Sequence, residues 1–108
     1  MKVVCLDAVA ESLPGPWQPA DVARVNNSVV RIAKIQGEFP WHHHNEDELF
    51  LAFRGEFTLE TEGHGNFSLR PGQCILVPAG TRHRPVAREE AVILLFELQK
   101  TKQYGEQP

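Results

Sequence analysis

Short runs of β-branched and aromatic residues recur along this chain about every ten residues, and Gly, Pro or Asn separates one run from the next. The run Val29–Ile35 ends before Gly37, and the run Cys74–Val77 lies between Gly72 and Pro78. Apolar residues at helical spacing are hard to find. The pattern therefore predicts an all-β fold, either a barrel or a sandwich, with little helix.

These boundaries define a specific set of expected strands. They are Lys2–Leu6, Val29–Ile35, Leu49–Phe53, Glu56–Glu62, Asn66–Leu69, Cys74–Val77 and Ala91–Leu98. We expect a hairpin at Gly63-His64-Gly65 and a charged turn at Arg88-Glu89-Glu90, after a short run over 85–87. The proline-rich segment Pro14–Pro19 should be irregular and lie over the surface, with Trp17 as its anchor.

A chain of 108 residues has room for one hydrophobic core, so we expect a single domain over residues 1–108. Within it, residues 1–28 should form an N-terminal strand and loop, residues 29–98 the barrel core, and residues 99–108 a polar tail that frays.

Charge and the N-terminal residues exclude several classes of partner. The net charge is −3, and acidic and basic residues are interspersed, so the chain lacks the basic surface that nucleic acid requires. The stretch MKVVCLDAV is too short for a signal-peptide core or a membrane span, which favours a cytoplasmic protein without a membrane partner. We expect Cys5 and Cys74 to be free and buried, with Cys74 in the core.

The stretch PWHHHNEDELFLAFRG carries the densest group of possible metal ligands. On an extended strand His42 and His44 point to one face and His43 to the other. Glu48 would lie roughly 13 Å beyond His44 on a straight strand, but the turn-forming residues 45–47 can fold it back. His83, after the turn Pro78-Ala79-Gly80, offers a fourth ligand.

Three neutral imidazoles and one carboxylate suit a divalent transition metal, namely Fe, Mn, Ni, Cu or Zn, better than Ca or Mg. A polar network without metal is the alternative. Four protein ligands leave coordination positions open in six-coordinate geometry, as in catalytic metal sites. Phe50 and Ala52 share the face of Glu48 and should line the pocket.

The surroundings of the site suggest two further features. Leu49, Leu51 and Phe53 form an apolar outer face, which suggests cover by another part of the chain or by a second subunit, and we expect a homodimer. The nearest cations that could bind an anionic substrate are Arg54, Arg82 and Arg84. His64 sits in a hairpin and receives no role.

Two stretches of this sequence together resemble the paired motifs of the cupin superfamily. GEFPWHHHNEDELFLAFRG supplies Gly37, His42, His44, Glu48 and Gly55, and GQCILVPAGTRHRPVA supplies Gly72, Pro78, Gly80 and His83. There are two departures: four residues instead of five separate Gly37 from His42, and Ala87 stands where the second motif ends in Asn. The lead-in with Trp17 and Pro19 is similar to small cupins described as mannose-6-phosphate isomerase-like.

The resemblance implies an antiparallel double-stranded β-helix, or jelly-roll barrel, with a metal near one end of its lumen, commonly in a homodimer. It also implies a metal-dependent enzyme acting on a small polar metabolite, by dioxygenase, isomerase or decarboxylase chemistry. A non-catalytic protein that binds a small molecule and a sugar-phosphate isomerase are the alternatives. The motifs of serine hydrolases, P-loop proteins and dinucleotide-binding proteins are missing from the sequence.

Overall fold

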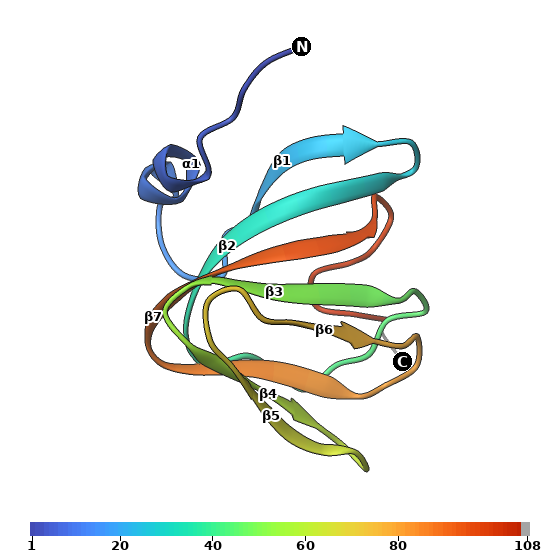
Figure 1. Ribbon diagram of the computed structural model, residues 1–108. Coiled ribbons are helices and arrows are strands. Elements are labelled where there is room, and N and C mark those ends of the chain that lie inside the picture. The colour runs from blue at the N-terminus through green and yellow to red at the C-terminus, as the bar shows by residue number, and fades with distance from the viewer. Residues whose placement is uncertain (107–108) are drawn as a thin grey trace.

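Antiparallel strand pairing builds almost all of this structure, a computed structural model that describes residues 1–106 (Figure 1). The elements are α1 (Leu6–Ser12), β1 (Ala20–Val25), β2 (Ser28–Glu38), β3 (Glu48–Arg54), β4 (Phe57–Thr61), β5 (Gly65–Leu69), β6 (Cys74–Val77) and β7 (His83–Leu98). The expected all-β antiparallel fold with little helix is therefore confirmed. No helix among residues 1–106 is long and apolar enough to cross a membrane.

The long strand β7 organises the sheet. The strand order is β1, β2, β7, β3, β6, and the hairpin of β4 and β5 joins the sheet through β4, which also pairs with β7. Figure 1 shows the strands curving around a common interior, with the β4–β5 hairpin projecting at the bottom. The strands form a curved, barrel-like sheet that does not close completely.

Alternation along the strands divides the apolar residues between two clusters. On β3, Phe50 and Ala52 point into the inner core, where they meet residues such as Leu59 and Ile93. The opposite face of β3 is half-buried, and its Leu51 packs with Phe53 in a second cluster that includes residues of α1 and β2. The expected apolar outer face is thus partly covered by the chain's own N-terminal segment.

The predicted strand over Lys2–Leu6 is wrong, because the first element is the helix α1. Its apolar residues Leu6, Val9, Ala10 and Leu13 follow the spacing of one helical face, and they pack in the outer cluster. Pro14 disfavours helical geometry at Leu13, where the helix ends. The helical spacing is present in the sequence, but it spans only two turns and is therefore a weak signal.

The predicted charged turn at Arg88-Glu89-Glu90 is also wrong, because β7 runs without interruption through it. Ile35 of β2 faces Ala91 and Gly37 faces Ala87, so three residues of β7 stand opposite one residue of β2. This bulge lets the charged side chains reach solvent while the strand bends. Strand pairing on both sides of the bulge outweighs the local turn preference.

Two further expectations differ from the structure. The sequence interpretation left residues 20–25 without an element, whereas β1 pairs there with β2 across a turn at Asn26, whose φ is 54°. Cys5 and Cys74 are both free, as expected, but both are exposed. Cys74 lies on β6, the last strand of the sheet order, where few elements cover it.

The C-terminal segment 99–106 is packed against the body and does not fray as predicted. The Gln99 amide donates to the Asn27 carbonyl at 3.0 Å, and the Glu106 amide donates to the His43 carbonyl at 2.9 Å. Gly105 approaches so closely that an added Cβ would lie 2.3 Å from the His43 carbonyl oxygen. Backbone hydrogen bonds, which a polar sequence does not reveal, hold this segment in place.

Candidate metal centre

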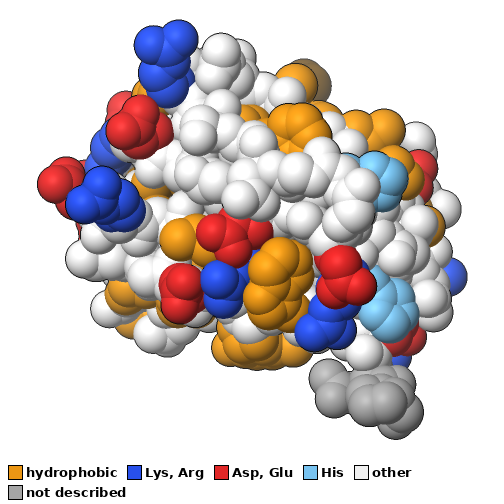
Figure 2. All heavy atoms as spheres, turned by 90° about the horizontal axis from the view of Figure 1, so that it is seen from below, with side chains coloured by type: hydrophobic (Ala, Val, Ile, Leu, Met, Phe, Trp, Pro, Cys, Tyr) orange, Lys and Arg blue, Asp and Glu red, His pale blue; other side chains and the backbone are white. Residues whose placement is uncertain are grey.

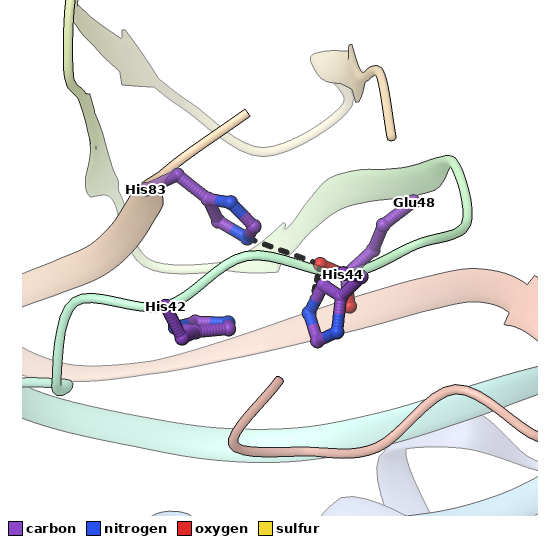
Figure 3. Close-up of side chains that lie close together, drawn as sticks. All are labelled: His42, His44, Glu48 and His83. Atoms are coloured by element: carbon purple, nitrogen blue, oxygen red, sulfur yellow. Dashed lines mark hydrogen bonds and ion pairs between the residues drawn. The ribbon is translucent and has the colours of Figure 1, made fainter. Parts of the chain in front are cut away.

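Four buried side chains from separate segments converge at one point of the interior (Figure 3). His42 and His44 precede β3, Glu48 is the first residue of β3, and His83 is the first residue of β7. One ligand atom from each lies within 4.8 Å of the others. The structure thus brings together all four ligands that the sequence spacing indicates.

Main-chain contacts fix the segments that carry these ligands. His42 and His83 pair across an isolated bridge, in which each amide donates to the other carbonyl at 3.1 and 2.9 Å. The Gly80 amide donates to the His44 carbonyl at 2.8 Å. Asp47 accepts a 2.8 Å hydrogen bond from the Ala79 amide, so its carboxylate joins the two ligand-bearing loops and does not enter the ligand group.

Backbone carbonyls orient two of the imidazoles. Nδ1 of His42 donates to the Pro40 carbonyl, and Nδ1 of His83 donates to the Thr81 carbonyl, both at 2.8 Å. Because a carbonyl can only accept, each Nδ1 carries a proton, so in the neutral ring Nε2 keeps the lone pair that a metal binds. Both ring nitrogens of His44 are buried; within residues 1–106 Nδ1 has no hydrogen-bond partner, and Nε2 lies 3.2 Å from the Glu48 carboxylate without the geometry of a hydrogen bond.

The charges of the group favour metal binding. Burial lowers the pKa of His42 to about 4, and positive charge on His83 and His44 would lower it further, so this ring is neutral at pH 7. Burial on its own raises the pKa of Glu48, but the 3.2 Å contacts of its carboxylate with the imidazoles of His44 and His83 outweigh burial, and the pKa falls below its usual range. His42 is therefore a neutral imidazole and Glu48 an ionised carboxylate, the forms in which these groups ligate metals.

The residues present fit a divalent transition metal. Imidazole nitrogen and carboxylate oxygen match Fe, Mn, Ni, Cu or Zn, and an ion would supply the partner that one buried ring nitrogen of His44 lacks. Figure 3 shows the three rings and the carboxylate directed toward a common centre. A polar network alone leaves Nε2 of His44 without a well-formed hydrogen bond, which disfavours that alternative.

A cavity of about 300 Å³ borders the ligand group through His42 and Glu48. Phe50 lines this cavity, whereas Ala52, the other predicted pocket residue, is fully buried in the inner core and does not line it. Trp17 also lines the cavity, and its indole nitrogen donates to the Gln36 carbonyl at 3.0 Å, which ties the irregular segment before β1 to β2.

A second carboxylate at the cavity, Glu97, was missed in the sequence interpretation. It is 7% exposed and accepts a 3.0 Å hydrogen bond from Nη1 of Arg31. Burial, helped by the charge of Glu48, raises the pKa of Glu97 to about 9. Strand alternation could have found it, because Ile93, Leu95 and Glu97 are two residues apart and line one face of β7.

The three candidate arginines all lie in ion pairs away from the cavity lining. These pairs join Arg54 to Asp7 and Glu11, Arg82 to Glu62, and Arg84 to Glu38 and Glu60. Figure 2 shows acidic and basic side chains side by side around hydrophobic ones on the face that it presents. His43 is half-buried outside the ligand group, and His64 is exposed.

Two known proteins are similar to this chain in sequence. The chain is 32% identical over 97 residues to the uncharacterized protein YdbB of Bacillus subtilis (strain 168), covering 89% of this chain and 86% of that protein. It is 28% identical over 87 residues to acireductone dioxygenase of Exiguobacterium sibiricum, covering 76% of this chain but only 49% of that protein.

Solved structures and a family profile extend this agreement to the fold. The crystal structure of a cupin-2 domain containing protein from Shewanella frigidimarina superposes with a TM-score of 0.85 at 28% identity, covering 90% of this chain and 95% of that one. The profile described as "Cupin domain" matches residues 28–97, from the start of β2 almost to the end of β7. This protein therefore belongs to the cupin domain family.

Proposed function

We propose that this protein is a metal-dependent dioxygenase that holds one divalent ion, Fe(II) in the active form, between His42, His44, Glu48 and His83. The observation that carries the proposal is the convergence of four buried donor groups at the edge of a cavity. When bound, such an ion supplies Lewis acidity and, as iron, the means of activating dioxygen. The likeness to acireductone dioxygenase supports oxygen chemistry over the alternatives.

The chain's own residues would prepare the site. The carbonyls of Pro40 and Thr81 hold two imidazoles in the ligating tautomer before the ion arrives, and Glu48 offsets part of its charge. The cavity admits a substrate beside the ligands while its apolar walls exclude bulk water. Glu97, which keeps its proton at neutral pH, is the carboxyl group outside the ligand set that lines this cavity.

The function is tested by measuring metal content and oxygen consumption on the same samples. Protein purified without a polyhistidine tag should retain about one equivalent of transition metal, and iron-loaded protein should consume oxygen in the presence of a substrate. Turnover of that substrate without oxygen would contradict the dioxygenase proposal and indicate isomerase or lyase chemistry. Zinc-loaded protein is the control, because zinc has no redox chemistry.

The sugar-phosphate isomerase alternative has less support. A phosphate needs several uncommitted donors. Arg54, Arg82 and Arg84 are engaged in ion pairs on the surface and do not line the cavity.

We also propose that the protein is a homodimer. Val30, Phe96, Leu49 and Leu76 are successive cross-strand neighbours on β2, β7, β3 and β6 and form an apolar row on the outer face of the sheet. Phe96 is 41% and Leu76 56% exposed, because the α1 cluster covers only the adjoining part of this face. Burial of such a row against a second copy would remove apolar surface from water.

A further inference from the structure

The walls of the cavity beside the metal centre are predominantly apolar and include several flat rings. The rings of Trp17 and Phe39 pack with centroids 4.8 Å apart, and Phe50 adds a third aromatic side chain. The aliphatic side chains of Ile35, Ile93 and Leu95 complete much of the remaining wall. A wall of this kind favours a flat hydrophobic ligand, which can stack against the rings or meet them edge-on.

The cationic side chain at the cavity already has several partners. Among the described residues that line the cavity, Arg31 alone is a lysine or arginine. Its guanidinium donates to Asp21, to Glu97 and to the carbonyls of Gln99 and Thr101 at 3.0 to 3.2 Å. In the metal-free protein an anionic ligand would therefore face two carboxyl groups without an uncommitted cation. A cationic ligand would find Glu97 protonated and bonded to Arg31, and it would compete with the imidazoles for Glu48.

The size of the cavity limits the ligand. Its volume of about 300 Å³ is about twice that of an engineered apolar cavity that binds benzene. One ring with a short substituent fits this volume. Thr101 and Gln103 of the C-terminal segment form part of the wall, and Tyr104 stacks on Phe39 from outside at a centroid distance of 4.8 Å. The C-terminal segment therefore helps to limit the size of the ligand.

We infer that the substrate class is a small uncharged molecule built on a single ring, with a hydroxyl or similar polar group placed toward His42 and Glu48. As a statement about the substrate, the inference rests on the proposed function. As a statement about binding, it rests on the walls of the cavity alone. It replaces the small polar metabolite that the sequence suggested, because most of the cavity wall is apolar and few polar side chains reach it.

The test is a matched series of probes titrated into zinc-loaded and metal-free protein at pH 7.5. Tryptophan fluorescence is the readout, because Trp17 lines the cavity. Benzyl alcohol, benzoate and benzylamine share one ring and differ in charge, and glycerol represents uncharged polar metabolites. Benzyl alcohol should bind at least tenfold more tightly than each of the other three. Equal or tighter binding of benzoate, benzylamine or glycerol would overturn the inference.

Substitutions at two alanines test whether benzyl alcohol binds in this cavity. Ala33 lines it on β2, whereas Ala23 is exposed on β1. Ala33→Leu adds apolar bulk inside the cavity and should weaken benzyl alcohol binding at least tenfold, while Ala23→Leu should leave it within twofold. Unchanged affinity in a folded Ala33→Leu protein would refute the assignment. If that variant does not fold, the probe series on the native chain still decides the outcome.

Metal analysis of the same samples separates this inference from the proposed function. Protein that binds benzyl alcohol but retains no transition metal would contradict the proposed function and leave the ligand class intact. Protein that binds metal and consumes oxygen with a charged or acyclic substrate, but does not bind benzyl alcohol, would support the proposed function and contradict the inferred ligand class.

Discussion

Removing one ligand should abolish stabilisation of the protein by metal, and the structure offers a matched control. His83 is 1% exposed and belongs to the ligand group, whereas His43 is half-buried and lies outside it. The substitutions His83→Ala and His43→Ala each remove one imidazole. Only the first should weaken metal binding. Zinc serves as the probe because it suits the same donors and has no redox chemistry.

The magnitude follows from mass action. Zinc at about 100 times its dissociation constant adds about 2.7 kcal/mol to the free energy of unfolding. For a chain of this size 1 kcal/mol corresponds to roughly 4 °C, so Tm should rise by about 10 °C. Loss of one of four donors should weaken binding by about 100-fold or more, which leaves about 0.4 kcal/mol, or a rise below about 2 °C.

The assay is differential scanning fluorimetry with and without zinc, together with elemental analysis of dialysed protein. Each variant is compared with its own metal-free form, because His83→Ala also removes a 3.2 Å contact with Glu48 and lowers the starting stability. The His43→Ala protein should keep nearly the full rise in Tm. An equal loss in both variants, or a full rise in His83→Ala, would refute the assignment of the ligands.

Three further predictions concern pH, packing and assembly. Burial raises the pKa of Glu97 from 4.5 to about 9, so the native state holds a proton that the unfolded chain has released. The free energy of unfolding of metal-free protein, measured by urea denaturation, should therefore fall from pH 7 to pH 9. An equally steep fall in Glu97→Gln would contradict this cause. Gly105→Ala should destabilise the protein by about 1 to 3 kcal/mol more than Gly63→Ala in urea denaturation, because both glycines have positive φ but only Gly105 meets the His43 carbonyl. Light scattering should find a dimer at micromolar concentration and a monomer for Leu76→Lys; a native monomer would refute the proposed dimer.

Local patterns in the sequence were enough to predict the class of fold and the ligand group. Alternation over two residues places His42 and His44 on one face, and the turn-forming residues before Glu48 allow the chain to reverse. Such information is local, because strand alternation and turn chemistry depend on residues close in sequence. The helix α1 was also readable from its apolar spacing, although a short helix carries a weak signal.

Long-range pairing decided what the sequence could not. The charged residues 88–90 have the composition of a turn, yet pairing of β7 with β2 on both sides keeps them in one strand. The engagement of Arg31 by Glu97 and the placement of segment 99–106 beside the cavity join residues more than sixty positions apart. The sequence by itself therefore determined which side chains could bind a metal, whereas the tertiary structure alone decided the shape and polarity of the cavity beside them, because those depend on contacts between distant segments.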